Sequence, residues 1–197
     1  MIKDALKFIL AELNASIDAP AINDDSVVLG NLALVDANND AVSQGLLNKV
    51  VASVVNIQEE AAMRNLSNHR TTLNAQLRPV NLQQQPELYL NIYILFGANF
   101  TSNYENALLY IGNVIGFFQK KKTFDTSGDP ILGPVVKTLV MDLYSMNFTE
   151  LNQLWGILGG KYVPSALYKM KMVVIQKDTP LEIDGIVESI QINANVF

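Results

Sequence analysis

Residues 86–122 constrain the fold most strongly, because an apolar strand pattern in this segment leads directly into an amphipathic helix pattern. The strand pattern is apolar on both sides, so the strand needs cover on both faces of a sheet. In the helix pattern, Ser102 and Glu105 have the spacing of a capping box. The segment therefore predicts a strand followed by a helix at the centre of the core. Its apolar positions are Leu88, Leu90, Ile92, Ile94 and Phe96 on one side of the strand, Tyr89, Tyr93 and Leu95 on the other, and Ala107, Leu108, Ile111, Val114, Ile115 and Phe118 along the helix.

The composition predicts one domain over residues 1–197. The chain has 197 residues, of which 49% are hydrophobic, and this is enough for one well-filled core. The net charge of −5 argues against nucleic acid as a partner, because phosphate binding needs clustered positive charge. The basic run from Lys120 to Lys122 has a simpler role at the negative end of the helix dipole. The absence of cysteine excludes disulfides and thiolate metal sites, so we expect the core alone to stabilise the fold.

Residues 2–17 predict an amphipathic first helix, because their apolar side chains recur at helical spacing. Charges spread through residues 1–18 differ from the apolar centre of a secretory signal. No apolar run approaches the roughly 20 residues that a membrane-spanning helix needs. We therefore expect that the protein has no membrane partner. We also expect that it is made in the cytoplasm and stays there unless an assembly or cell lysis carries it out.

Strand patterns recur along the rest of the chain and are rich in β-branched and large apolar residues. A strand, a helix and a strand follow one another in residues 86–144, which permits a right-handed crossover between parallel strands. We expect an α+β fold with a mixed sheet, an N-terminal helix, a central β-α-β unit and a second short helix. The strands expected besides the central one lie at residues 27–35, 48–60, 135–144, 166–175 and 183–196.

The second helix is expected at residues 148–158. Asn147 and Glu150 have the spacing of an N-terminal capping signal, and Gly159 with Gly160 provides the stop. The glycines lie in the sequence GILGGK, which resembles a phosphate-binding loop. The spacing between its first and last glycines is one residue too short for such a loop. The glycines also end a helix, whereas a phosphate-binding loop precedes one. A helix C-cap is the favoured interpretation. The expected apolar face of this helix is Phe148, Leu151, Trp155 and Leu158.

Residues 61–85 form a long polar connection that ends in three glutamines and a proline. Connections longer than about fifteen residues are usually functional or disordered. We expect a flexible loop that becomes ordered only against a partner.

Few residues in this sequence are suited to catalysis or metal binding. Asp36, Asn38 and Asp40 have the opening spacing of a calcium loop, but Ala41 and Leu47 occupy the positions of its turn glycine and its bidentate carboxylate. We expect an Asx-rich turn there.

His69 is the one histidine, and it lies in the polar connection. The chain has no G-x-S-x-G motif that would place a nucleophilic serine for a catalytic triad. We therefore expect the His69 side chain to be solvated. The adjacent pairs Glu59-Glu60 and Asp24-Asp25 are poor acid–base pairs, because neighbours on a strand point to opposite faces. We predict no catalytic, cofactor-binding or metal-binding residue, no cofactor and no enzymatic activity.

Gly112 and Gly116 are unusual, since a glycine inside a helix costs about 1 kcal/mol relative to alanine and these two fall on one face. Close packing on the chain's own sheet is the favoured explanation, and contact with a neighbouring subunit is the alternative.

Several segments together resemble the tail-terminator, or cap, proteins of extracellular contractile injection systems, which are phage-tail-like particles of the antifeeding-prophage and virulence-cassette kind. The segments are NIQEE at residues 56–60 with Arg64 and Asn65, LYLNIYILFGANF with Tyr104 and a helix that ends in Phe117 and Phe118, and LNQLWGILGGKYVPS with Tyr168. The block at residues 155–165 is the most specific part, and the resemblance extends from the first helix to about residue 175.

The resemblance implies a non-enzymatic structural protein. Members of this family are expected to form a six-subunit ring on the last discs of the inner tube and the contractile sheath, which ends their polymerisation. The implied partners are the inner tube protein, the contractile sheath protein and further copies of the chain, in a particle released from the cell. The resemblance also implies that many relatives carry a further C-terminal region beyond the position of Phe197, and the family provides no catalytic residues.

Two alternatives remain open. One is another structural component of the same particle, in the baseplate or as a connector, and the other is a small-ligand-binding or hydrolytic domain that uses residues 36–40 or His69. Two segments are candidates for assembly contacts. The polar connection at 61–85 could order against tube or sheath subunits, and the terminal strand at 186–197 could add to a neighbour's sheet edge, although pairing within its own domain is favoured.

Overall fold

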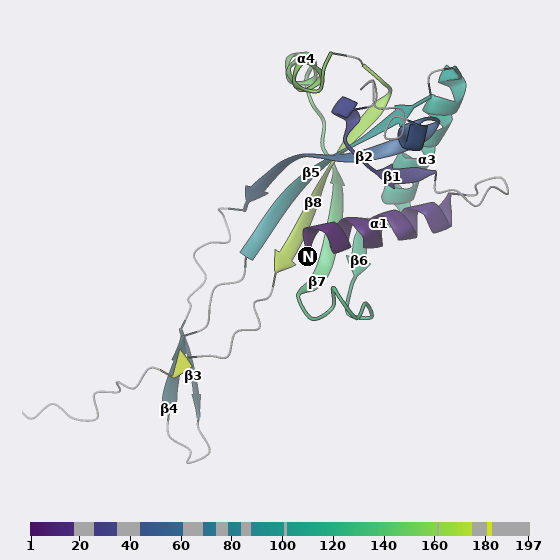
Figure 1. Cartoon of the computed structure of the whole chain (residues 1–197). Coiled ribbons are helices and arrows are strands. Elements are labelled where there is room, and N and C mark those ends of the chain that lie inside the picture. Colours follow the sequence, from purple (N-terminus) through teal and green to yellow (C-terminus); the bar gives the residue numbers. More distant parts are fainter. Residues whose placement is uncertain are drawn as a thin grey trace, which may run out of the picture.

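The computed structural model describes residues 1–17, 26–34, 44–60, 69–73, 79–83, 88–100, 102–160, 162–174 and 181–182. Within these residues the chain forms a six-stranded sheet, a three-stranded sheet and helices on the larger sheet (Figure 1). The elements are α1 (Ile2–Ser16), β1 (Val27–Leu29), the 3-10 helix η1 (Leu32–Leu34), β2 (Lys49–Glu59), β3 (His69–Leu73), β4 (Pro79–Gln83), β5 (Leu88–Asn99), α3 (Tyr104–Lys120), β6 (Thr123–Asp125), β7 (Val136–Leu143), α4 (Phe148–Ile157), β8 (Ser165–Val174) and β9 (Leu181–Glu182).

The six-stranded sheet has the order β1-β2-β5-β8-β7-β6 and is mixed, as predicted. β1 and β2 are parallel, whereas the other neighbouring pairs are antiparallel. β5 and β7 are both antiparallel to β8, so they run in the same direction. The predicted strand–helix–strand unit is therefore present, but its two strands are not neighbours, because β8 from later in the chain lies between them.

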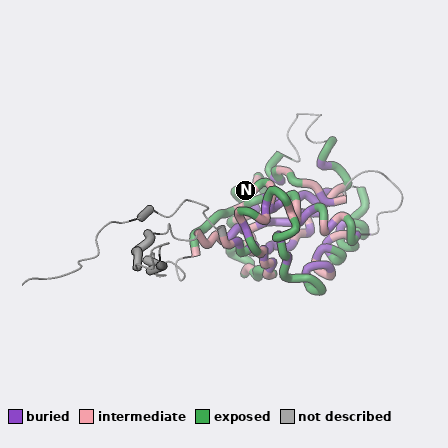
Figure 2. Tube along the Cα trace, turned by 90° about the horizontal axis from the view of Figure 1, so that it is seen from below, coloured by how far each residue is buried: buried purple, intermediate pink, exposed green. Residues whose placement is uncertain are grey.

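The larger core lies between one face of this sheet and the helices α1 and α3. Phe96 of β5 and Tyr168 of β8 point to this face, and the ring of Phe118 from α3 packs on both, with centroid distances of 5.6 Å and 4.8 Å. At the surface, Lys121 Nζ lies 2.6 Å from Glu12 Oε2 and links the end of α3 to α1. In Figure 2 the buried positions gather inside this body and the exposed positions surround it.

A smaller core lies on the opposite face, at one end of the sheet. Trp155 of α4 and Leu32 of η1 pack there on strand residues that include Leu95 and Leu167. The central strand β5 is therefore covered on both faces, as its sequence predicts, because Ile94 and Phe96 belong to the larger core and Leu95 to the smaller one.

The helices begin and end close to their predicted positions, with two corrections. The N-cap of α3 is Asn103 and not the predicted Ser102. The Asn103 side chain accepts a hydrogen bond from the backbone N–H of Asn106. Serine and asparagine are both good N-cap residues, so the sequence alone does not decide between these two neighbours. On the same helix Leu108 is 51% exposed, while Phe117, absent from the predicted stripe, is buried.

The expected strand at residues 27–35 is shorter than predicted. Only Val27–Leu29 pairs, with β2, and the chain then turns into η1. A Cβ built on Gly30 would lie 2.7 Å from Leu46 Cδ2, so this glycine allows the turn to approach the chain closely.

The prediction of an irregular loop at residues 61–85 is wrong in part. Within it, β3 and β4 form an antiparallel pair, and β9 adds to β4 to complete the three-stranded sheet, which lies away from the six-stranded sheet (Figure 1). Short polar strands have no apolar periodicity, so the sequence pattern gives little sign of them. The strand predicted at 183–196 lies outside the described residues.

Candidate assembly site

The residues considered for chemistry do not come together in the described part of the chain. His69 lies on β3, paired with Gln83, and not in a loop. The Asp36–Asp40 turn and the Asp24-Asp25 pair lie outside the described residues. Among the described residues no three His, Asp or Glu side chains are close enough together to hold a metal ion. No helix in the same residues is long and apolar enough to cross a membrane.

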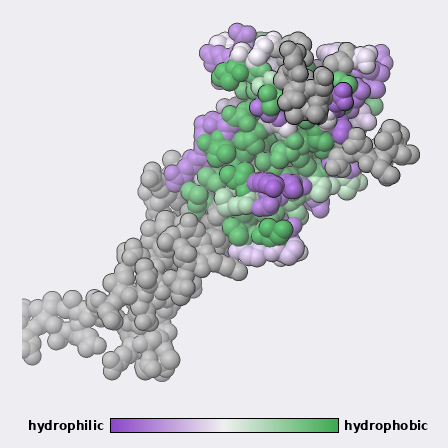
Figure 3. Space-filling model, viewed as in Figure 1, coloured by the Kyte–Doolittle hydropathy of each residue, from purple (hydrophilic) through white to green (hydrophobic). Residues whose placement is uncertain are grey.

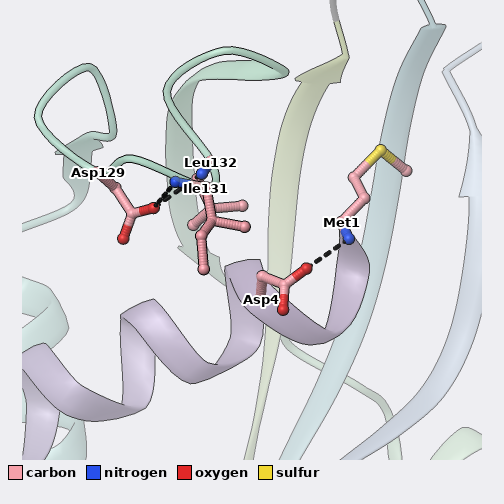
Figure 4. A network of polar contacts seen from close by, with 5 residues as sticks. All are labelled: Met1, Asp4, Asp129, Ile131 and Leu132. Atoms are coloured by element: carbon pink, nitrogen blue, oxygen red, sulfur yellow. Dashed lines mark hydrogen bonds and ion pairs between the residues drawn. The ribbon is translucent and has the colours of Figure 1, made fainter.

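Figure 4 shows two carboxylates, Asp129 and Asp4, and each has its own local partners. Asp129 Oδ1 accepts hydrogen bonds from the backbone N–H groups of Ile131 and Leu132, at 2.8 Å and 2.7 Å. Asp4 Oδ2 lies 2.6 Å from the ammonium group of Met1, and this hydrogen bond lowers the pKa of Asp4. Both side chains therefore stabilise a turn or a helix start.

The glycines of the GILGGK sequence form a helix C-cap, as predicted. Gly159 and Gly160 have positive φ angles of 103° and 83°. The backbone N–H of Gly160 bonds the carbonyl of Trp155 at 2.7 Å, and that of Gly159 bonds the carbonyl of Gly156 at 3.4 Å, which is the Schellman pattern. Because these N–H groups satisfy helix carbonyls, they are not arranged to hold a phosphate.

Gly112 and Gly116 face open space on α3. A Cβ built on either residue meets no atom within 4 Å, so the favoured explanation, close packing on the chain's own sheet, is wrong for the described residues. Contact with a neighbouring subunit stays a prediction. Leu108 and Leu109 lie near these glycines on α3 and are 51% and 59% exposed. The outer surface of α3 therefore presents apolar side chains beside a shallow, side-chain-free strip.

α4 also presents apolar side chains, and it lies on the other side of the sheet. Phe148 is 90% exposed and Ile157 is 82% exposed. Phe148 therefore does not belong to the packed face of α4 that the sequence predicts, whereas Trp155 is buried and Leu151 and Leu158 are partly buried. The Nε1 atom of Trp155 is buried without a hydrogen-bond partner in the described structure.

The part of the sheet face that α4 leaves open is polar. Lys171 Nζ of β8 lies 2.7 Å from Asp142 Oδ2 of β7, and this hydrogen bond lowers the pKa of Asp142 and raises the pKa of Lys171. On β5, Asn91 Nδ2 donates to Glu60 Oε2 at 2.8 Å.

Figure 3 shows hydrophobic residues gathered over the middle of the larger body and hydrophilic residues mainly around them. Charged strand residues and exposed apolar helix residues thus offer several surfaces for protein contacts.

Two solved structures share this fold, and both come from contractile injection systems. The first is the sheath/tube terminator of an extracellular contractile injection system, PVC, in its extended state, with a TM-score of 0.61 and 14% identity over 100% of this chain and 65% of that chain. The second is the tube-terminating cap of the anti-feeding prophage, with a TM-score of 0.59 and 14% identity over 97% of this chain and 59% of that chain. The chain thus has the α+β fold of terminator proteins and spans about three fifths of their length.

The sequence itself gives a more specific assignment. Residues 4–189 match the model of the Pvc16 N-terminal domain family, and the chain belongs to this family. A search of curated protein sequences finds no match. The match covers nearly the whole chain, so the resemblance inferred from the sequence segments is confirmed at the level of the family.

Proposed function

We propose that this protein is a terminator of a contractile, phage-tail-like injection particle, where it binds the last discs of the inner tube and the sheath and ends their polymerisation. Membership of the Pvc16 N-terminal domain family over residues 4–189 carries this proposal. Two solved structures of the same fold, a sheath/tube terminator and a tube-terminating cap, support it. The role is structural and needs no catalytic group.

In this proposal residues 1–197 act as one domain, and six copies form a ring on the tube and sheath. A helical stack leaves one unpaired interface at its end, and a ring of head-to-tail contacts covers that interface without presenting another copy of it. The apolar residues exposed on α3 and α4 lie on the two sides of the six-stranded sheet, which suits contacts between unlike surfaces. The particle carries the protein out of the cell in which it is made.

The test is electron microscopy of particles from a producer strain that lacks this protein. We expect overlong, ragged or absent sheaths and tubes, and normal lengths when the intact protein is supplied again. Particles with ordinary lengths and ordinary ends would contradict the terminator function.

A baseplate or connector role is the structural alternative, and location separates it from a terminator. A label on the protein should lie at the end of the particle away from the baseplate. A label at the baseplate end would favour the alternative.

A further inference from the structure

An apolar cleft lies at the edge of the larger core, between the second half of α3 and strands β7 and β8. Its volume is about 350 Å³, and its walls come from the same face of the sheet as α1 and α3. Leu143, at the end of β7, lines the cleft and is 56% exposed, so the cleft is open to the surface. The lining residues are Ile115, Phe118, Gln119, Lys122, Met141, Leu143 and Tyr168.

Phe148 is the most exposed of the large apolar side chains in the described residues, at 90%. It is the first residue of α4, and a capping box holds this helix start in place: Asn147 Oδ1 accepts from the N–H of Glu150 at 2.9 Å, and Glu150 Oε2 accepts from the N–H of Asn147 at 3.0 Å. An exposed aromatic ring on a rigid support is the usual form of an interface anchor, because little conformational entropy is lost when it binds.

The cleft and the packed side of α4 lie on opposite faces of the six-stranded sheet. Phe118, Met141 and Tyr168 of the cleft belong to the larger core, whereas α4 packs through Trp155 on the opposite face of the sheet. A projection on one side and a cleft on the other allow a head-to-tail contact between copies, and such contacts generate rings when the rotation between copies closes.

The charges beside these two features have opposite signs. Lys122 lines the cleft, Lys120 lies two residues before it at the end of α3, and both are exposed. Glu150 is two residues from Phe148 and is also exposed. A phenyl ring placed in the cleft would therefore bring a carboxylate near ammonium groups, and complementary charges of this kind select the orientation of a contact.

We propose that Phe148 of one copy inserts into the α3–β7–β8 cleft of the next copy, with Glu150 facing Lys122, and that this contact joins neighbouring subunits of the ring. The occupant of the cleft is thus a second copy of this chain. The inference rests on the proposed ring, and it adds the two surfaces that meet.

Cysteine cross-linking tests the contact directly, because the chain has no cysteine of its own. Every copy in a particle would keep Phe148 and would carry Thr149→Cys, at the exposed residue beside it, together with Gln119→Cys at the cleft, and a short bifunctional thiol reagent would be added. We expect a ladder of covalent oligomers that ends at the ring, which also counts its subunits. Each single variant should give no ladder. The control pair Ile157→Cys with Gln119→Cys, which moves the thiol to the other end of α4, should cross-link several-fold less.

Charge reversal provides a second measurement that leaves Phe148 and the apolar residues of the cleft unchanged. Lys122→Glu and Glu150→Lys should each lower the fraction of particles that retain this protein, by about tenfold, and the double variant should recover most of it. Lack of recovery in the double variant would overturn the proposed contact. Cross-links from the Thr149→Cys variant that reach only tube or sheath subunits would also overturn it.

The outcomes separate this contact from the terminator function. If the strain lacking the protein has overlong particles and the cysteine pair gives no ladder, the function stands and the contact is wrong. If the ladder forms and the deleted strain still makes ordinary particles, the contact stands and the terminator function is wrong.

Discussion

Gly97 of β5 lies so close to Leu32 of η1 that a Cβ built on the glycine would be 2.8 Å from Leu32 Cδ2. Val163 Cγ2 would lie 3.2 Å from the same Cβ, so the position is crowded by two side chains. This glycine lets η1 and the segment before β8 pack directly on the central strand, in the smaller core that also holds Trp155.

Replacement of Gly97 should therefore destabilise the protein. Since the added carbon must displace the buried Leu32 side chain, we expect Gly97→Ala to lower the free energy of unfolding by about 1 kcal/mol and Gly97→Val by up to about 3 kcal/mol. Chemical denaturation measures both. Gly112→Ala is the matched control: its Cβ meets nothing within 4 Å, and it should raise stability by up to about 1 kcal/mol in the isolated chain. Equal stability of the Gly97 variants and the wild type would show that the packing at η1 is looser than described.

The N-cap of α4 should contribute measurably to stability. Asn147→Ala removes the acceptor for the Glu150 N–H and should cost about 1 kcal/mol, whereas Asn147→Asp keeps an acceptor and should cost much less. Thermal unfolding of the two variants provides the comparison. Similar losses in both variants would contradict a capping role for this side chain.

The ion pair between Asp142 and Lys171 should make stability weakly dependent on pH. The folded-state pKa of Asp142 is lowered, so its contribution is present above the unfolded value near 4 and is lost as the pH falls through the folded pKa. The pKa of Lys171 is raised, so the contribution is also lost in strong alkali, above about pH 10.

Asp142→Asn tests this dependence. Both side chains are more than one third exposed, so solvent screening limits the loss to less than about 1 kcal/mol at pH 7. The difference from the wild type should shrink below about pH 4 and in high salt. A loss that is the same at pH 3 and pH 7 would mean that packing, not charge, explains it.

Tyr168 should make the protein less stable in alkali. Burial raises the pKa of Tyr168 to about 12, so the unfolded chain releases this proton near pH 10 while the folded chain still holds it. The stabilising contribution is complete below about pH 10 and is lost as the pH rises toward 12.

Tyr168→Phe removes this dependence and keeps the ring that packs on Phe96 and Phe118. The free energy of unfolding should therefore decrease less between pH 8 and pH 11 in the variant than in the wild type. Ultraviolet titration of the folded wild type should show a tyrosine ionisation near pH 12 that is missing from Tyr168→Phe. Identical pH profiles for the two proteins would argue against a buried phenol.

Local sequence patterns predicted most of the elements in the larger body. The capping pair Asn147 and Glu150, the Gly159-Gly160 stop and the two apolar faces of β5 all lie where the sequence indicates, because caps and apolar alternation depend on residues near one another in the chain. The same patterns did not separate Ser102 from Asn103, and they gave no sign of β3 and β4, whose residues are mostly polar.

The candidate contact surfaces were harder to predict than the elements. Phe148 has helical spacing with Leu151 and Trp155, so the sequence assigns it to a buried face, yet its side chain is 90% exposed. Gly112 and Gly116 are unusual in sequence, but only the structure excludes an intramolecular contact for them within its described residues. The exposure of these residues depends on how each helix packs on the sheet, and the periodicity of the sequence does not determine that packing.

The sequence by itself determined the mixed α+β composition, the central strand and helix, and the segments that indicate the family, because these depend on local spacing and on residue identity. Only the tertiary structure decided that β8 separates β5 from β7, that the larger and smaller cores lie on opposite faces of the sheet, and that Phe148 is exposed at the start of α4. The physical reason is that strand order and helix placement come from contacts between residues far apart in the chain. No local pattern specifies which of the possible pairings buries the most apolar surface.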